Sequence, residues 1–293
     1  MRKEKENDIF YKRIHEIDFI RGILIVLVFL DHLLNLINSY NTSWAGGNLA
    51  LINGTGIEPY ATFAKIAKTY FTLPFNMYDA ASWNYSIRKI VQCICLGTFC
   101  FISGISCSFS KSNKKRAFQM MSFWLLILIF SNILDNIYRT NNLDFGIKSC
   151  QINFNIIGVL AFSVLTYTVF ENKDYKWLIG AIIAILLIHV ICAYVSLINP
   201  NCPADTFGLF LLQGDKSFGE QADYMPLFPY MAFFFIGALI GKFTYSKNRL
   251  SYFKIHEWER PICFVGRHTL IIYFTHFIIL IGIFSLLGIF IGK

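Results

Sequence analysis

The stretch RGILIVLVFLDHLLNLI, residues 21–37, decides how the rest of the chain is interpreted. It is nearly as long as the run of about 20 apolar residues that crosses a bilayer as a helix. Four polar residues interrupt it: Arg21, Asp31, His32 and Asn35. Ionisable side chains inside a membrane helix are costly and usually face a cavity or a partner. The stretch therefore predicts a membrane helix with a functional polar face.

The composition of the whole chain agrees with solvation by lipid. Of its 293 residues 55% are hydrophobic, and only 15% are charged, against about 25% in soluble domains. The mean hydropathy is +0.51. The net charge of +8 does not indicate nucleic-acid binding, because the charges lie between apolar segments. The lipid bilayer is the expected partner, and nucleic acid is not.

Apolar segments of spanning length predict the fold class, an all-α integral membrane protein. The predicted bundle has about seven transmembrane helices and forms a single domain over residues 1–293. The seven segments are 19–37, 88–109, 117–138, 152–170, 175–198, 225–245 and 268–290. Within the sixth, Gly237 and Gly241 form a GxxxG motif, which predicts close helix packing.

The charges of the loops predict the orientation. With the N-terminus inside, the segments 1–18, 110–116, 171–176 and 242–260 carry sixteen Lys and Arg, and the outside segments carry six. Lys and Arg are enriched in cytoplasmic loops. The chain is therefore expected in the cell membrane as a multi-pass protein with a cytoplasmic N-terminal segment 1–18 and an extracytoplasmic C-terminus. Residues 38–85 and 199–224 are expected to form extracytoplasmic loops.

Helix geometry puts two polar residues of the first segment on one face. Arg21 and His32 are eleven residues apart, which is about three full turns, or about 16.5 Å along the axis. Asn35 lies beside His32 on that face, and Asp31 is turned about 100° away. A plainer interpretation is also open, in which Arg21 anchors the helix at the headgroups and Asp31 and His32 lie near the outer water.

The last segment carries a second polar stripe. Thr269, Tyr273 and His276 share a helix face, and Arg267 lies at the inner edge. For His276, a hydrogen-bonded structural role and a catalytic role both remain open. The outer end of the third segment holds Asp135, for which acceptor binding and a pairing with Arg139 are the alternatives.

The cysteines do not suggest a metal centre. None is part of a CxxC motif or of a Cys/His spacing typical of zinc, so no metal is expected. Cys150 and Cys202 both fall on the predicted outer side, where a disulfide is chemically permitted.

Five motifs in a fixed order give the chain a resemblance to a known family. They are IDFIRGILIVLVFLDH, FCFISGIS, INFNIIGVL, DYMPLFPYMAFFFIGALIGK and FVGRHTLIIYFTH. Together they resemble the heparan-alpha-glucosaminide N-acetyltransferase catalytic-domain family in its compact bacterial form, from about residue 14 to 285. The spacing of Arg21 and His32 is also similar to that of membrane acyltransferases that O-acylate surface glycans.

The resemblance implies transfer of an acyl group from a thioester, typically acetyl-CoA as co-substrate, to an amine or hydroxyl of a glycan or glycolipid across the membrane. Arg21 and Arg267 are then candidates for binding the donor's phosphates. His32 and His276 are the catalytic candidates, acting by proton transfer or through an acyl-histidine. Candidates for binding the acceptor are Asp31, Asn35, Asp135 and Tyr273. A homo-oligomer is compatible with these features.

One position departs from the family pattern. Lysosomal members carry a histidine immediately before an Ala-Ser-Trp-Asn run, whereas this chain has Ala80 there, with Asp79 before it. The same members carry Asn in place of His32. Either the catalytic histidine has moved to His32, or the acceptor differs. Two other classes stay open, a multi-pass transporter and a non-enzymatic membrane protein on the same scaffold, although no repeat typical of transporters is evident.

Overall fold

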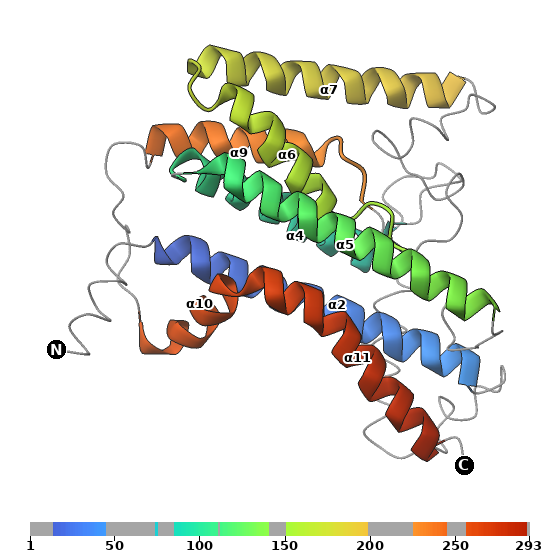
Figure 1. The fold of residues 1–293 in the computed structure, drawn as a ribbon. Coiled ribbons are helices and arrows are strands. Elements are labelled where there is room, and N and C mark those ends of the chain that lie inside the picture. Colours follow the sequence, from blue (N-terminus) through green and yellow to red (C-terminus); the bar gives the residue numbers. More distant parts are fainter. Residues whose placement is uncertain are drawn as a thin grey trace. The chain divides into compact units, whose positions relative to one another are not determined.

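The computed structural model describes residues 14–44, 74–75, 85–110, 112–140, 151–198, 225–244 and 256–291. Its helices are α2 (His15–Trp44), α4 (Ile87–Ser108), α5 (Asn113–Thr140), α6 (Ile156–Phe170), α7 (Tyr175–Ile198), α9 (Tyr230–Thr244), the 3-10 turn η2 (Glu257–Glu259), α10 (Arg260–Arg267) and α11 (Thr269–Ile291) (Figure 1). Two short strands, β1 (Pro74–Phe75) and β2 (Tyr85–Ser86), pair antiparallel.

The chain divides into two compact units. The first unit comprises Met1–Ile14, Leu96–Leu143 and Lys148–Ser251, and it contains most of α4 together with α5, α6, α7 and α9. The second unit comprises His15–Cys95, Asp144–Ile147 and Tyr252–Lys293, and it contains α2, α10 and α11.

Helices form in all seven predicted segments, so the all-α prediction is confirmed for the described residues apart from the short strand pair. Three helices there are long and apolar enough to cross a membrane, namely Val91–Ser108, Asn113–Ile137 and Tyr175–Cys192. The number of seven spans remains a prediction.

Two predicted boundaries were wrong. Helix α2 continues to Trp44, into the predicted loop 38–85, because no glycine or proline interrupts the chain between Gly22 and Gly46. Helix α6 begins at Ile156 rather than 152, because the side chain of Asn155 accepts hydrogen bonds from the backbone N–H of Ile157 and Gly158 and thereby caps the helix. One helix of the second unit, α10, was missed.

Small residues bring α4 and α9 of the first unit into close contact. A Cβ atom added to Gly104 would collide with the carbonyl oxygen of Phe234, and one added to Gly237 would collide with that of Phe101. Gly241 meets the side chain of Ser108 in the same way. The prediction that the GxxxG motif serves close helix packing is confirmed.

Before α6 the chain is not helical, yet its carbonyl groups are satisfied. The carbonyl of Ile152 accepts from Ser131 Oγ at 3.2 Å, and that of Asn153 accepts from Trp124 Nε1 at 3.1 Å. The carbonyl of Phe154 accepts from the N–H of Met225 at 2.9 Å. Residues 152–154 are therefore fixed to α5 and to the segment that precedes α9.

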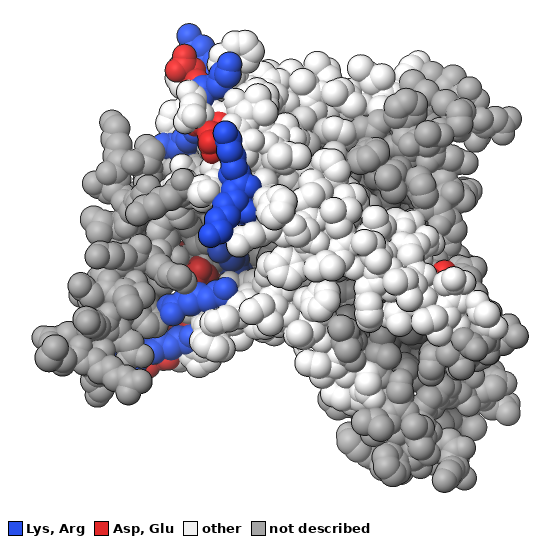
Figure 2. All heavy atoms as spheres, in the orientation of Figure 1, with Lys and Arg blue, Asp and Glu red and all other residues white. Residues whose placement is uncertain are grey.

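One end of the first unit gathers the charges of three predicted cytoplasmic segments. Lys242 Nζ donates to the carbonyls of Glu171 at 2.9 Å and Lys173 at 3.1 Å, which ties the end of α9 to the turn between α6 and α7. Asn113 Nδ2 donates to Glu171 Oε2 at 2.9 Å, which adds the start of α5. The described ends of these segments therefore lie together in the first unit. In Figure 2 the Lys and Arg side chains are blue and all residues other than Lys, Arg, Asp and Glu are white.

The second unit is built on a contact between α2 and α10. A Cβ atom on Gly22 would collide with the carbonyl oxygen of Ile262, and one on Gly266 would collide with that of Asp18. Cys263, which is fully buried, donates its thiol to the carbonyl of His15 at 3.8 Å. Burial raises the pKa of the Cys263 thiol, so this cysteine is a neutral packing residue.

We expect Gly266→Ala to destabilise the protein strongly, because the added methyl group meets the backbone of α2 rather than a side chain that can move. Overpacking of this kind costs about 1–3 kcal/mol or more. Gly180→Ala in α7 is the matched control, since nothing lies within 4 Å of its added Cβ atom. Thermal unfolding in detergent should show a lower midpoint for Gly266→Ala alone; equal midpoints would contradict the close contact.

A second prediction concerns orientation. Lys115 is exposed in the first turn of α5, and Thr140 is exposed at its last residue. On a background without the native cysteines, Lys115→Cys should react with an impermeant thiol reagent only from the cytoplasmic side, and Thr140→Cys only from outside. The reverse pattern would invert the predicted topology.

Candidate functional site

Two clusters of polar side chains lie along α2 in the second unit. The histidine pair consists of His32 on α2 and His276 on α11, and the arginine cluster consists of Asp18 and Arg21 on α2 with Arg267 on α10. His32 follows Arg21 by eleven residues, or about 16 Å along the helix. Helix α11 follows α10 directly, so each cluster combines residues of α2 with residues of the continuous segment α10–α11.

The histidine pair brings together two residues that are distant in the sequence. His276 Nε2 lies 3.2 Å from His32 Nδ1, and the ring centroids are 4.9 Å apart with the planes inclined by 54°. Only 6% of His276 is exposed. Two ionisable residues that sequence analysis selected independently are thus hydrogen-bonded to each other.

The acceptors around each ring assign its proton. His276 Nδ1 lies 2.6 Å from the carbonyl oxygen of Tyr273 and 3.2 Å from that of Ile272, so Nδ1 carries the hydrogen and Nε2 accepts. His32 Nδ1 lies 3.0 Å from the carbonyl oxygen of Val28 as well as near His276 Nε2. It therefore donates, and the lone pair of neutral His32 is on Nε2.

Aromatic rings flank the histidine pair. The ring of Tyr273 lies 5.4 Å from that of His276, and the ring of Phe29 lies 6.4 Å away. These two aromatic rings therefore border the histidine pair on its α2 and α11 sides.

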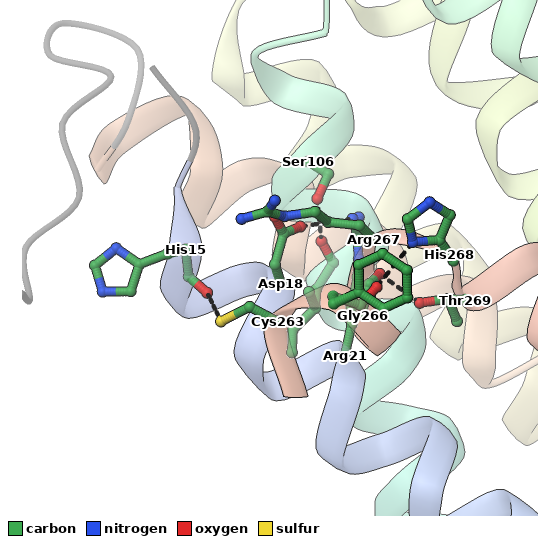
Figure 3. A network of polar contacts seen from close by, with 11 residues as sticks. His15, Asp18, Arg21, Ser106, Cys263, Gly266, Arg267, His268 and Thr269 are labelled. Atoms are coloured by element: carbon green, nitrogen blue, oxygen red, sulfur yellow. Dashed lines mark hydrogen bonds and ion pairs between the residues drawn. The ribbon is translucent and has the colours of Figure 1, made fainter. Parts of the chain in front are cut away.

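The arginine cluster surrounds one carboxylate. Arg267 Nε donates to Asp18 Oδ2 at 3.3 Å, and Arg21 Nη1 lies 3.9 Å from Asp18 Oδ1 (Figure 3). The exposed fraction is 19% for each arginine side chain and 11% for Asp18. The sequence analysis selected both arginines as candidates for binding the donor's phosphates. In the structure both contact Asp18, which the sequence analysis did not select.

A break between two helices directs Arg267 toward α2. Helix α10 ends at Arg267, and His268 has backbone angles of φ −103° and ψ 19°, after which α11 begins. Thr269 Oγ1 donates to the carbonyl of Gly266 at 2.5 Å and fixes the junction. The close approach of Gly266 to Asp18 then places Arg267 beside the Asp18 carboxylate.

Comparison with known families decides the classification. Residues 65–278 match the family described as heparan-alpha-glucosaminide N-acetyltransferase, catalytic. The chain belongs to this family. The matched residues include Arg267 and His276, whereas Arg21 and His32 precede them. No curated protein and no solved structure matches the chain.

The structure also locates three of the other predicted site residues. Asp31 is half-buried on α2, and Tyr273 packs beside His276. Asp135 lies buried on α5, in the first unit. The side chains of Asn35 and Arg139, together with Asp79, Ala80, Cys150 and Cys202, lie outside what the structure describes. Among the described residues no three His, Cys, Asp or Glu gather as metal ligands.

Polar residues near Asp135 are engaged with one another. Gln151 Nε2 donates to Asn132 Oδ1 at 2.8 Å, and Asn132 Nδ2 donates to the carbonyl of Leu128 at 2.7 Å. In the structure they hold the chain before α6 against α5.

The assigned proton positions are testable by nitrogen NMR on protein labelled with ¹⁵N-histidine. At neutral pH we expect His276 to be protonated on Nδ1, because two carbonyl oxygens lie at that atom, whereas free histidine favours Nε2. His276→Asn identifies the resonance. Protonation of His276 on Nε2 would reverse the direction of the hydrogen bond to His32.

Proposed function

We propose that this protein transfers an acetyl group from acetyl-CoA on the cytoplasmic side to an amine or hydroxyl of an extracytoplasmic glycan or glycolipid. The family membership supports acetyl transfer. The observation that carries the proposal for this chain is the contact of 3.2 Å between His276 Nε2 and His32 Nδ1. A general base held by a hydrogen-bond acceptor on its other nitrogen is the arrangement that acyl transfer uses.

In the proposed reaction His32 Nε2 removes the proton from the acceptor amine or hydroxyl. The acceptor atom attacks the carbonyl carbon of the thioester and forms a new C–N or C–O bond. Collapse of the tetrahedral intermediate breaks the C–S bond. The sulfur then takes the proton from His32 Nε2, so that coenzyme A leaves as the thiol and His32 returns to its neutral form.

His276 acts on His32 rather than on the substrate. When His32 takes up a proton it becomes cationic, and its Nδ1–H then donates more strongly to His276 Nε2. The hydrogen bond also fixes the His32 ring so that Nε2 is the basic atom. In this reaction His276 is a positioning residue, and His32 is the catalytic one of the two histidine candidates.

The arginine cluster determines the direction in which the donor would be bound. A guanidinium binds phosphate in a fork geometry, and Arg21 and Arg267 gather at the end of α2 that loop charges assign to the cytoplasm. The phosphate end of coenzyme A would lie there, with the flexible arm directed along α2 toward His32. Asp31, Asn35 and Tyr273, close to the histidines in the sequence, remain the candidates for the acceptor, with Asp135 as the candidate from α5.

Substitution of the histidines tests the proposal. His32→Ala should lower acetyl transfer from labelled acetyl-CoA by about 10²–10⁴-fold, the usual loss on removing a general base. His276→Ala should lower it by about 10–100-fold, the equivalent of one charge-assisted hydrogen bond. Both proteins should remain folded and should bind coenzyme A.

The control is His256→Ala, which changes an exposed histidine of the second unit and should leave the rate within about twofold, since surface changes are usually small. If His32→Ala retained its activity while His276→Ala lost it, the base would be on α11. If neither substitution lowered the rate, the chemistry would lie outside the histidine pair.

A further inference from the structure

We propose that one end of the first unit binds the headgroups of anionic phospholipids. We call this surface the basic end, and it consists of Lys114, Lys115, Arg116, Lys173 and Lys176. The partner is an anionic lipid in particular rather than the bilayer in general. Its binding does not depend on the proposed acetyl transfer, because the basic end shares no residue with the histidine pair or the arginine cluster.

Hydrogen bonds bring several helix ends together at the basic end. Asn113, the first residue of α5, donates from Nδ2 to the carbonyl of Cys107 at 3.0 Å and to Glu171 Oε2 at 2.9 Å. These bonds fix the start of α5 beside the end of α4 and the turn between α6 and α7. Candidate membrane spans end at Ser108 and begin at Asn113 and Tyr175. The bilayer surface on this side is therefore expected at the level of the basic end.

The positive charges of the basic end exceed the negative charges around them. Its lysines are exposed and Arg116 is half-buried, and none of the five side chains forms an ion pair with another residue that the structure describes. Lys242, whose ammonium group donates to three backbone carbonyls, adds one positive charge. The carboxylates here are Asp174 and Glu171, which accepts from Asn113. Six positive and two negative side chains leave a net charge of +4, which favours an anionic partner.

Helix polarity adds to this positive potential. Helices α5 and α7 both begin at the basic end, and a helix N-terminus carries a partial positive charge of about half a unit. Acidic residues in the first turn offset that charge, yet neither helix has one there. Asp174 stands directly before α7, whereas residues 110–116 contain four Lys and Arg and no carboxylate. The phosphate group of a lipid would supply the negative charge that the start of α5 lacks.

Exposed aromatic rings next to the lysines indicate that the anion belongs to a lipid rather than to a soluble molecule. Trp177 is 58% exposed, Phe243 64% and Phe118 74%. The Nζ atom of Lys173 lies 5.2 Å from the centroid of the Trp177 ring, a cation–π contact. Tryptophan is enriched at the level of the headgroups, so this contact holds the Lys173 ammonium group at the depth of the lipid phosphates. The exposed rings would contact the upper part of the acyl chains.

The experiment measures binding of phosphatidylglycerol and phosphatidylcholine, which carry the same fluorescently labelled acyl chains, to the full-length protein in nonionic detergent. We expect the anionic lipid to bind about tenfold more tightly or better, because each lysine near a membrane surface contributes about fivefold. Lys114→Gln combined with Lys173→Gln should weaken phosphatidylglycerol binding by about 25-fold on the same scale and leave phosphatidylcholine binding unchanged. Asp174→Asn, which removes a negative charge, should strengthen phosphatidylglycerol binding.

The matched control is Lys114→Arg combined with Lys173→Arg, which keeps both charges and should retain the affinity within about twofold. Equal binding of the two lipids by the wild-type protein, or unchanged phosphatidylglycerol binding by the glutamine variant, would overturn the proposal. Displacement of phosphatidylglycerol by inorganic phosphate at equal concentration would also overturn it, because the basic end would then bind soluble anions. If the double glutamine variant does not fold, Lys114→Gln alone decides: binding about fivefold weaker supports the proposal, and unchanged binding contradicts it.

Discussion

The close contact between α2 and α10 is the constraint on which the second unit depends. Gly22 and Gly266 allow the two backbones to touch, and no residue with a side chain fits at either position. Next to this contact Arg267 binds Asp18, and α11, which follows, packs against α2. Nine residues after Arg267 the chain arrives at His276, beside His32. Backbone packing at one end thus determines which side chains meet at the other.

This arrangement also answers why a helix that is predicted to cross the membrane carries ionisable residues. An isolated charge or imidazole in lipid is expensive, and each of these polar groups is paired with another. Asp18 offsets two arginines, and each histidine has a backbone carbonyl and the other ring as partners. The pairing lowers the cost of burial and at the same time fixes side-chain geometry, so the stabilising contacts and the proposed chemistry involve the same atoms.

How much of this was predictable differs between the residues. Helical periodicity placed Arg21 and His32 on one face, and the cost of polar groups in lipid singled out His276, because both arguments are local. The contact of His32 with His276 is not local, since 244 residues separate them, and no sequence spacing encodes it. Asp18 was missed although it stands three residues before Arg21, a spacing that signals a helical ion pair. Helix α10 was missed because Pro261 and the charged residues around it resemble a loop.

The fixed carbonyls before α6 bear on how the first unit meets the bilayer. Helix α6 has 15 residues, about 22 Å at 1.5 Å per residue, and the hydrocarbon core is about 30 Å thick. Non-helical backbone is excluded from that depth unless protein groups satisfy it. The carbonyls of Ile152, Asn153 and Phe154 have protein donors, and the carbonyl of Asn155 accepts from the N–H of Val159. The carbonyl groups of this segment therefore meet the condition under which non-helical backbone can lie at hydrocarbon depth, so the predicted span of residues 152–170 is compatible with a helix that begins only at residue 156.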